Sequence, residues 1–381
     1  MVTSTDVLVI GAGPTGLTLT TALAAGGVHA TVVDAMPSGA NTSRAAAVAA
    51  RTLEVLEELD VSERLVKSGL QARTFSIRDH DRVLIPLDFG SLPTAYPYTL
   101  MISQAETEKM LLDRLEELGG HVTRPKKLIA VRQESDCAVA SFEDGDEIRA
   151  RYVVGADGMH STVRAAAGIN FVGAAYPASF VLADVRMTGE VPVSEILLFF
   201  ARNGLVVVAP LPGDVFRIVS PVADAPAEPE REFVQELLDT RGFGPGQLQV
   251  GEVVWGSRFR VHHRVADTYR SGRLLLAGDA AHVHSPAGGQ GMNLGVQDAV
   301  ALADVLDRVI VGGEPDQLLD AYSDARRPIA RQVVKLTDRL TRLATLPSGL
   351  RPARNVAMSA ASRIPAVRRA LTWQLSGLVY R

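Results

Sequence analysis

The chain has 381 residues, enough to bury a sizeable core in one large domain or two of ordinary size. Its formal net charge of -4 gives no broad basic surface that would favour a nucleic acid or an anionic membrane as a partner. Cys137 is the only cysteine, which excludes an intramolecular disulfide and a cysteine-based metal site, so we expect a protein of the reducing cytoplasm.

The first 34 residues predict a strand, a glycine turn, a helix and a second strand. A short apolar run from Val7 to Ile10 precedes a G-x-G-x-x-G turn, and helix formers follow as far as Ala25. The turn consists of Gly11, Ala12, Gly13, Pro14, Thr15 and Gly16. The second strand ends on Asp34, whose carboxylate is suitably spaced to accept hydrogen bonds from a ribose diol. The pattern therefore predicts a dinucleotide site, and the alternative is a βαβ unit that binds no nucleotide.

This apolar start lacks a basic leader and is interrupted by glycines and a proline, so we expect neither a signal peptide nor a membrane span. A polar loop over 37–43 then leads into a predicted helix over 45–60. Ser43 and Arg44 lie where the loop enters that helix. The arginine could neutralise a phosphate held by the first turn, and an ordinary surface position is nearly as well supported.

Residues 71–100 predict an excursion from the nucleotide-binding domain. A β-hairpin is expected around residues 79–81, followed by a segment broken by prolines. An amphipathic helix is expected over 104–118, starting at Gln104, and short strands over 122–148. Further along, a buried strand over 152–154 leads to Asp157 in a glycine turn, and a short helix with Ser161 and Arg164 follows. That acid could face a cofactor or cap the helix, and the local pattern favours the cap.

The stretch from 170 to 265 contains strand after strand, interrupted by one helix over 231–240. Adjacent strands of this kind predict an antiparallel sheet in a second layer, where we expect most of the substrate-contacting surface. Next, a strand over 274–277 runs into Asp279 and a loop with several glycines, and a helix begins near Asn293. No second G-x-G-x-x-G is present, so one elongated cofactor held at both ends is the simplest interpretation, and FAD has that length.

Other side chains give weaker signals. His282 and His284 could belong to a metal site, but a packed or loop position is favoured, and we expect no metal. Arg217 could face an anionic or phenolic ligand. The basic helical region 325–373 is expected to pack over the nucleotide domain instead of binding a membrane. Aromatic residues that could line a pocket but more often serve a core are Phe199, Phe200 and Trp255, while His262 and His263 are expected at a surface or between domains.

Three motifs resemble the sequence signatures of class A FAD-dependent monooxygenases with the para-hydroxybenzoate hydroxylase fold. They are GAGPTG at 11–16, GADGMHSTVR at 155–164 and GDAAHVHSPAGGQGMNLGVQDA at 278–299. The segments SRAAAVAARTLEVLEELDV (43–61), YPYTLMISQAETEKML (96–111) and LSGLVYR (375–381) resemble the bacterial aromatic polyketide hydroxylase and antibiotic-modifying subgroup. Members of that subgroup commonly carry a C-terminal thioredoxin-like domain, which we do not expect here.

The resemblance implies an α/β fold with an α+β second layer. A Rossmann-like FAD-binding domain would comprise residues 1–70, 101–170 and 266–340. An inserted substrate-binding domain with an antiparallel sheet would comprise residues 71–100 and 171–265. C-terminal helices would occupy residues 341–381.

The resemblance also implies roles for individual residues. The pyrophosphate would lie against Gly11, Gly13, Pro14, Thr15 and Gly16. Asp34 would bind the adenosine ribose, although the family more often has Glu followed by Arg there. The phosphate and ribityl region would contact Ser43, Arg44, Gln104 and Asp279. The isoalloxazine would meet the loop residues Pro286, Gly289, Gly291, Met292 and Asn293, with Pro286 near C4a and N5. Asp157 and Arg164 match the motif linked to both FAD and the pyridine nucleotide.

The implied activity is hydroxylation of a small aromatic substrate, expected to be a polycyclic phenol or polyketide-like compound. NADPH or NADH would reduce FAD, and a flavin C4a-hydroperoxide formed with molecular oxygen would deliver one oxygen atom. Alternatives are Baeyer–Villiger oxygenation, epoxidation, inactivation of an antibiotic, or a flavin- or ligand-binding protein without turnover. We expect a monomer or homodimer with no nucleic-acid or membrane partner.

Overall fold

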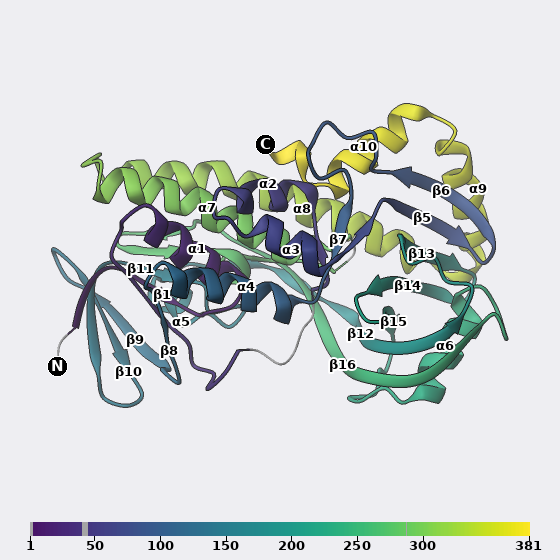
Figure 1. Cartoon of the computed structure of the whole chain (residues 1–381), viewed down its shortest axis with the longest axis horizontal. Coiled ribbons are helices and arrows are strands. Elements are labelled where there is room, and N and C mark those ends of the chain that lie inside the picture. Colours follow the sequence, from purple (N-terminus) through teal and green to yellow (C-terminus); the bar gives the residue numbers. More distant parts are fainter. Residues whose placement is uncertain (1–2, 40–44, 287) are drawn as a thin grey trace.

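The computed structural model describes residues 3–39, 45–286 and 288–381, so Ser43 and Arg44 lie outside the described residues. Two eight-stranded sheets lie at opposite ends of the molecule, with a small three-stranded sheet as the third (Figure 1). The mixed α/β class expected from the sequence is confirmed.

The first large sheet contains the nucleotide-type strands in the order β17-β18-β11-β1-β2-β8, with β10 paired to β11 and β9 to β10. β1 pairs in parallel with β2 and β11, as does β11 with β18. The strands are β1 (Thr3–Ile10), β2 (Ala30–Val33), β8 (Val122–Thr123), β9 (Leu128–Gln133), β10 (Ala138–Phe142), β11 (Glu147–Gly155), β17 (Arg270–Ser271) and β18 (Leu274–Leu276). The residues from Val7 to Ile10 are almost completely buried, because helices cover a parallel sheet on its faces.

The second large sheet has the order β19-β16-β12-β15-β14-β13-β5-β6. Its strands are β5 (Thr74–Asp79), β6 (Arg82–Asp88), β12 (Phe171–Gly189), β13 (Glu195–Ala201), β14 (Gly204–Leu211), β15 (Val215–Val222), β16 (Leu248–Ala266) and β19 (His282–Val283). The expected antiparallel pairing is present throughout, with one exception, because β5 pairs in parallel with β13. The predicted hairpin around residues 79–81 thus extends this sheet at its edge.

The third sheet is formed by β3 (Ala47–Val48), β7 (Thr99–Met101) and β4 (Leu70–Ala72). The helix expected over 45–60 therefore begins only at Ala50, because residues 47–48 form a strand that pairs with β7. Local periodicity cannot reveal such a short strand, since its partner lies some distance along the chain.

Helices cover the parallel sheet and the outer edge of the second sheet. They are α1 (Pro14–Ala25), α2 (Ala50–Glu57), α3 (Ser62–Ser68), α4 (Gln104–Glu117), α5 (Thr162–Ala166), α6 (Arg231–Arg241), α7 (Gly291–Ile310), α8 (Leu318–Ala344), α9 (Arg351–Ala361) and α10 (Pro365–Leu375). Short 3-10 turns occur at η1 (Gly278–Ala280), η2 (Ser348–Leu350) and η3 (Leu378–Tyr380). None of these described helices combines the length and apolarity needed to cross a bilayer.

The C-terminal helices correct one expectation. α8 packs against α7 of the nucleotide region, as expected, but α9 and α10 lie on β6 of the second sheet (Figure 1). Leu84 and Leu87 of β6 share an apolar cluster with Met358 and Leu371. The sequence of 325–373 did not predict this arrangement. The apolar residues of α9 and α10 show that each helix has a buried face, but they do not show which surface that face contacts. The domain boundaries proposed from the sequence stay a prediction.

Candidate cofactor and substrate site

The backbone of the first glycine turn lies in close contact with the turn that follows β11. Gly11 has φ +103°, and a Cβ atom there would lie 2.4 Å from the carbonyl oxygen of Ala156. At Gly16 a Cβ atom would lie 1.9 Å from the carbonyl oxygen of Gly11. A Cβ atom on Gly13 would meet nothing within 4 Å, so space is left open at the start of α1. Backbone N–H groups at a helix start favour an anion in such a space.

Asp34 lies beside this turn, as its distance along the sequence predicts. Its Oδ2 accepts a hydrogen bond from the backbone N–H of Ala12 at 2.6 Å, and Oδ1 accepts one from Met36 at 2.7 Å. The carboxylate therefore joins the first glycine turn to the segment that follows β2.

The two glycine motifs meet through Thr15. A Cβ atom on Gly278 would lie 2.5 Å from Thr15 Oγ1, and one on Gly295 would lie 2.4 Å from the same atom. The side chain of Thr15 thus fills the space that two glycines of the third motif leave empty. Asp279, in η1, is exposed next to this contact.

A cavity of about 670 Å³ opens between these turns and the second sheet. The predicted cofactor residues that line it are Gly13, Pro14, Thr15, Gln104, Asp279, Pro286, Gly289, Gly291, Met292 and Asn293. Gly11 and Gly16 shape the turn behind the cavity wall, and Asp34 does not belong to the lining. Predicted cofactor residues that are far apart in the sequence therefore lie around a single cavity.

The predicted start of the last helix near Asn293 is two residues late, because α7 begins at Gly291. The Asn293 side chain holds the loop in place: Oδ1 accepts from Ala49 N at 2.7 Å, and Nδ2 donates to Ala47 O at 2.8 Å and Gly289 O at 2.7 Å. Gln104 likewise accepts from Ala45 N at 3.2 Å. Both side chains fix the backbone that forms this part of the cavity wall.

Asp157 caps a helix in this structure, which is the alternative favoured by its local pattern. Its Oδ2 accepts from the backbone N–H groups of Thr162 and Val163 at 2.7 and 3.2 Å. Burial raises the pKa of this carboxyl group, and Asp157 is not part of the cavity lining. Arg164 donates to the carbonyl oxygen of Ala280 at 2.8 Å, so the second motif is attached to the third.

His282 is part of a buried ionic network. Its Nε2 lies 2.5 Å from Asp298 Oδ2, and Arg326 Nε donates to Asp298 Oδ1 at 2.6 Å. Burial opposes ionisation of Asp298, but Arg326 and His282 outweigh it and hold the pKa of the carboxyl group below its ordinary value. The network joins the strand before the glycine loop to α7 and α8.

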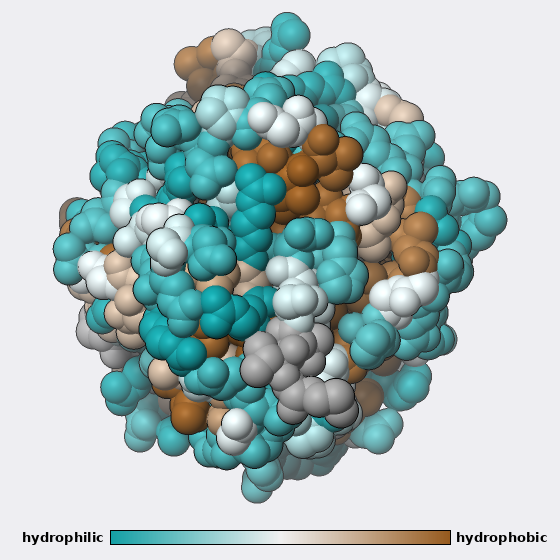
Figure 2. All heavy atoms as spheres, turned by 90° about the vertical axis from the view of Figure 1, so that its left-hand side faces the viewer, coloured by the Kyte–Doolittle hydropathy of each residue, from teal (hydrophilic) through white to brown (hydrophobic). Residues whose placement is uncertain are grey.

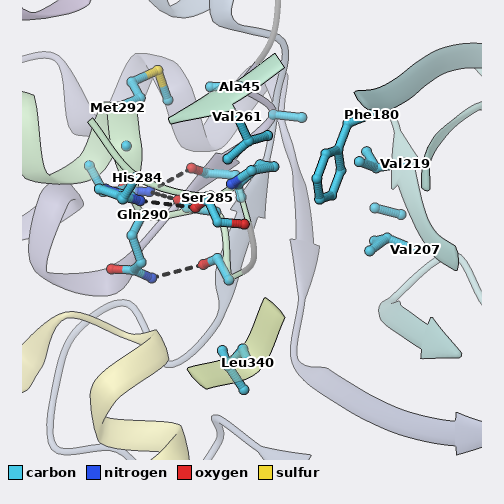
Figure 3. Close-up of a pocket in the computed structure, with 18 of the residues that line it drawn as sticks. Ala45, Phe180, Val207, Val219, Val261, His284, Ser285, Gln290, Met292 and Leu340 are labelled. Carbon is cyan, nitrogen blue, oxygen red and sulfur yellow. Dashed lines mark hydrogen bonds between the residues drawn. The ribbon is translucent and has the colours of Figure 1, made fainter. Parts of the chain in front are cut away.

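His284 contributes a polar atom to the cavity wall. Its Nδ1 lies 2.9 Å from the carbonyl oxygen of Ser285, to which it must donate, so Nε2 of the neutral ring is an acceptor (Figure 3). Burial lowers the pKa of His284 to about 4 and keeps the ring neutral. Nε2 is buried and has no hydrogen-bond partner in the part of the chain that the structure describes. A ligand N–H or O–H group could satisfy it.

The opposite wall is apolar and aromatic. Phe180 and Phe259 stack across β12 and β16 with ring centroids 5.7 Å apart. Figure 3 shows Phe180 between Val261 on one side and Val207 and Val219 on the other. Further apolar lining comes from Phe75, Ile77, Leu182, Leu198, Phe200, Leu336, Leu340, Leu371 and Leu375. This composition favours a flat apolar ligand.

Several secondary candidates can now be placed. Arg217 lines the cavity, but its Nε and Nη2 donate to both carboxylate oxygens of Asp184, each at 2.7 Å. Phe199 packs in the core of the second sheet, whereas Phe200 lines the cavity. His262 also lines it, next to Arg260. Sequence reasoning overlooked Phe180 and Phe259, because a single strand aromatic does not show which face of its sheet it occupies.

Comparisons with known proteins agree with this geometry. A family model described as "FAD binding domain" matches residues 4–337. An aromatic compound monooxygenase of Bacillus subtilis is 37% identical over 99% of this chain and 76% of its own length. A 12-dehydrotetracycline 5-monooxygenase/anhydrotetracycline 6-monooxygenase of Streptomyces rimosus is also 37% identical, over 87% of this chain and 68% of its own.

Solved structures show the same fold. The p-nitrophenol 4-monooxygenase of Pseudomonas putida superposes with a TM-score of 0.88 at 26% identity, over 99% of both chains. The anhydrotetracycline hydroxylase of Streptomyces rimosus gives a TM-score of 0.81 at 34% identity, over 98% of this chain and 76% of that one. With three motifs around one cavity and these relatives, the chain belongs to the FAD-binding class A monooxygenases and is an FAD-dependent aromatic compound monooxygenase.

Proposed function

We propose that the enzyme hydroxylates a polycyclic phenolic substrate, with molecular oxygen as co-substrate and NADPH or NADH as the electron donor. The observation that carries this proposal is the single cavity, which has the glycine turns on one wall and an apolar, aromatic sheet on the other. Its volume of about 670 Å³ leaves room for a ligand of several rings beside the reactive part of a cofactor. Relatives named for tetracycline intermediates, which are polycyclic, support this choice, and the relative named for p-nitrophenol makes a single-ring phenol the alternative that the test below separates.

The open start of α1 is the proposed position of the FAD pyrophosphate. The empty space at Gly13 and the N–H groups of the helix start suit a phosphate, and the exposed Asp279 would accept hydrogen bonds from the hydroxyl groups of the ribityl chain. The loop from Pro286 to Asn293 would hold the isoalloxazine, with Gly11, Gly16 and Asp34 supporting the turn from behind. When bound, FAD supplies the electron transfer and oxygen activation that hydroxylation requires.

The protein's own contribution is to orient the substrate and exclude water. The stacked pair of Phe180 and Phe259 offers ring faces to a planar ligand. Apolar side chains on the sheet and on α8 keep water away from the reacting atoms. His284 Nε2 would accept a hydrogen bond from the ligand and so select one orientation.

Positive charge at one edge of the cavity supports the use of a pyridine nucleotide. Arg260 and His262 line the cavity, and burial, Arg264, His160 and neighbouring cations together lower the pKa of His262. Arg260 forms no salt bridge within the described residues, and His262, whose pKa is lowered, is neutral and adds no positive charge at pH 7. An unpaired arginine in the cavity wall favours a ligand that carries phosphate groups.

The test is to purify the protein with FAD and measure NADPH and NADH oxidation with a panel of phenols of one to four rings. We expect a polycyclic phenol to stimulate oxidation and to yield a product that has gained one oxygen atom by mass spectrometry. Equal stimulation by single-ring phenols would reject the polycyclic assignment. Reductant consumption without an oxygenated product from any phenol would reject hydroxylation.

A further inference from the structure

A second, shallower groove adjoins the cavity where α8 meets the C-terminal turn. Its volume is about 230 Å³. It is lined by Gln332, Lys335, Leu336, Arg339, Gln374, Val379 and Tyr380. Leu336 of α8 and Gln374 of α10 line both the groove and the large cavity. The two spaces therefore share these side chains as a common wall.

The groove carries positive charge. Lys335 and Arg339 stand four residues apart on α8, are both exposed, and form no salt bridge within residues 3–39, 45–286 and 288–381. The nearest acid on the helix, Asp338, is already engaged by Tyr176 and Arg342, each at 2.8 Å. Like charges at this spacing repel each other, so an anion between them would be stabilising.

Besides the two cations, the groove is lined by two glutamines, Gln332 and Gln374, and by three apolar or aromatic side chains. Leu336 is half-buried, Val379 is 49% exposed, and the ring of Tyr380 packs against the core. Burial raises the pKa of Tyr380, so the phenol adds no negative charge to the groove at neutral pH. An apolar surface with two cations suits an organic anion better than a small hydrated ion, because hydrocarbon and carboxylate are recognised together.

We propose that this groove is a substrate subsite that binds the carboxylate of a carboxylated aromatic compound whose rings occupy the large cavity. For one ligand to reach both spaces it would pass beside Leu336 and Gln374, the two side chains that line the cavity and the groove alike. The inference rests on the proposed function, and it narrows the substrate class from a polycyclic phenol to one with an acidic group remote from the hydroxyl.

The experiment compares two ligands of the FAD-loaded enzyme, 2-naphthol and 6-hydroxy-2-naphthoate. The second carries its hydroxyl and carboxylate at opposite ends of the same two-ring frame. Dissociation constants are measured from the change in flavin absorbance, without turnover. We expect the carboxylate to bind more tightly, and Lys335→Gln and Arg339→Gln each to weaken its binding about two- to fivefold. Added salt should weaken the binding of 6-hydroxy-2-naphthoate and should leave the binding of 2-naphthol unchanged.

Arg369→Gln is the matched control, because it removes one exposed positive charge from α10 without touching either space. Arg369→Gln should leave the dissociation constants of both ligands unchanged. Lys335→Gln and Arg339→Gln should leave the dissociation constant of 2-naphthol unchanged. The subsite would be overturned if Arg369→Gln weakened the binding of 6-hydroxy-2-naphthoate as much as the groove variants do. It would also be overturned if both groove variants bound this ligand with the wild-type dissociation constant. If 2-naphthol still binds in that case, and a separate turnover assay shows that it is hydroxylated, the proposed function stands without the subsite. Failure of both compounds to perturb the flavin would overturn the subsite, and the panel of phenols described above would then decide the proposed function separately.

Discussion

Arg217 of β15 and Asp184 of β12 form a two-point ion pair in which both hydrogen bonds measure 2.7 Å. Both side chains are largely buried, with Arg217 4% and Asp184 14% exposed. The remaining Nη1 donates to the carbonyl oxygen of Ala45 at 3.0 Å. The pair therefore joins the second sheet to the segment that precedes β3.

Asp184→Asn should destabilise the protein, because it leaves the buried guanidinium without its counter-charge. We expect a loss of about 3–5 kcal/mol in the free energy of unfolding, measured by urea denaturation. As a control, Glu63→Gln breaks the exposed pair with Lys67 and should leave the urea midpoint unchanged. Equal midpoints for wild type and Asp184→Asn would show that the pair does not contribute to folding.

Gly13 and Gly16 should respond differently to alanine. A methyl group at Gly13 meets nothing within 4 Å, so Gly13→Ala should fold normally and yet bind FAD more weakly if the pyrophosphate uses that space. At Gly16 the methyl group would meet backbone at 1.9 Å, so Gly16→Ala should lose stability by about 1–3 kcal/mol as well. Thermal unfolding of the apoprotein and FAD titration separate the two effects. Full FAD affinity in Gly13→Ala would place the pyrophosphate elsewhere.

His284 should act as a hydrogen-bond acceptor. His284→Gln keeps a polar group at this position and His284→Phe does not, so only the phenylalanine variant should weaken binding of a phenolic ligand, by about fivefold or more. Because burial lowers the pKa of His284 to about 4, its ring stays neutral and ligand affinity should show no step from His284 between pH 6 and pH 8. Ligand titrations followed by flavin absorbance at several pH values test both statements. Identical affinities in the two variants would contradict the assigned role.

Asp298 should make the free energy of unfolding depend on pH in the acidic range. Its folded-state pKa is lowered by Arg326 and His282 against the opposing effect of burial, so the unfolded chain binds a proton more readily than the folded one. The stabilisation is then fully present above the unfolded value of about 4 and is lost as the pH falls through the lower folded value.

The measurement is urea denaturation of wild type and Asp298→Asn from pH 7 down to pH 3. We expect the variant to be less stable at pH 7, and the difference between the two proteins to shrink below about pH 4. Arg326→Gln, which keeps the carboxylate, should reduce the same acid dependence. A difference that stays constant over this range would mean that Asp298 has an ordinary pKa in the folded protein.

The local order of the sequence was enough to predict the elements that surround the cofactor site. The strand, glycine turn and helix of residues 7–25, the acid at Asp34 and the hairpin around residues 79–81 all depend on neighbours in the chain, and each was found. Glycine spacing is informative because a backbone that approaches another backbone, as at Gly16, tolerates no side chain. The roles of the individual cofactor residues stay predictions.

By itself, then, the sequence determined the fold class, the two glycine turns and the kind of cofactor. Only the tertiary structure placed Thr15 against Gly278 and Gly295, stacked Phe180 on Phe259, and left His284 Nε2 without a partner on the cavity wall. It also decided that α9 and α10 cover β6. The physical reason is that backbone conformation follows from adjacent residues, whereas the contacts of a side chain depend on surfaces supplied by distant parts of the chain.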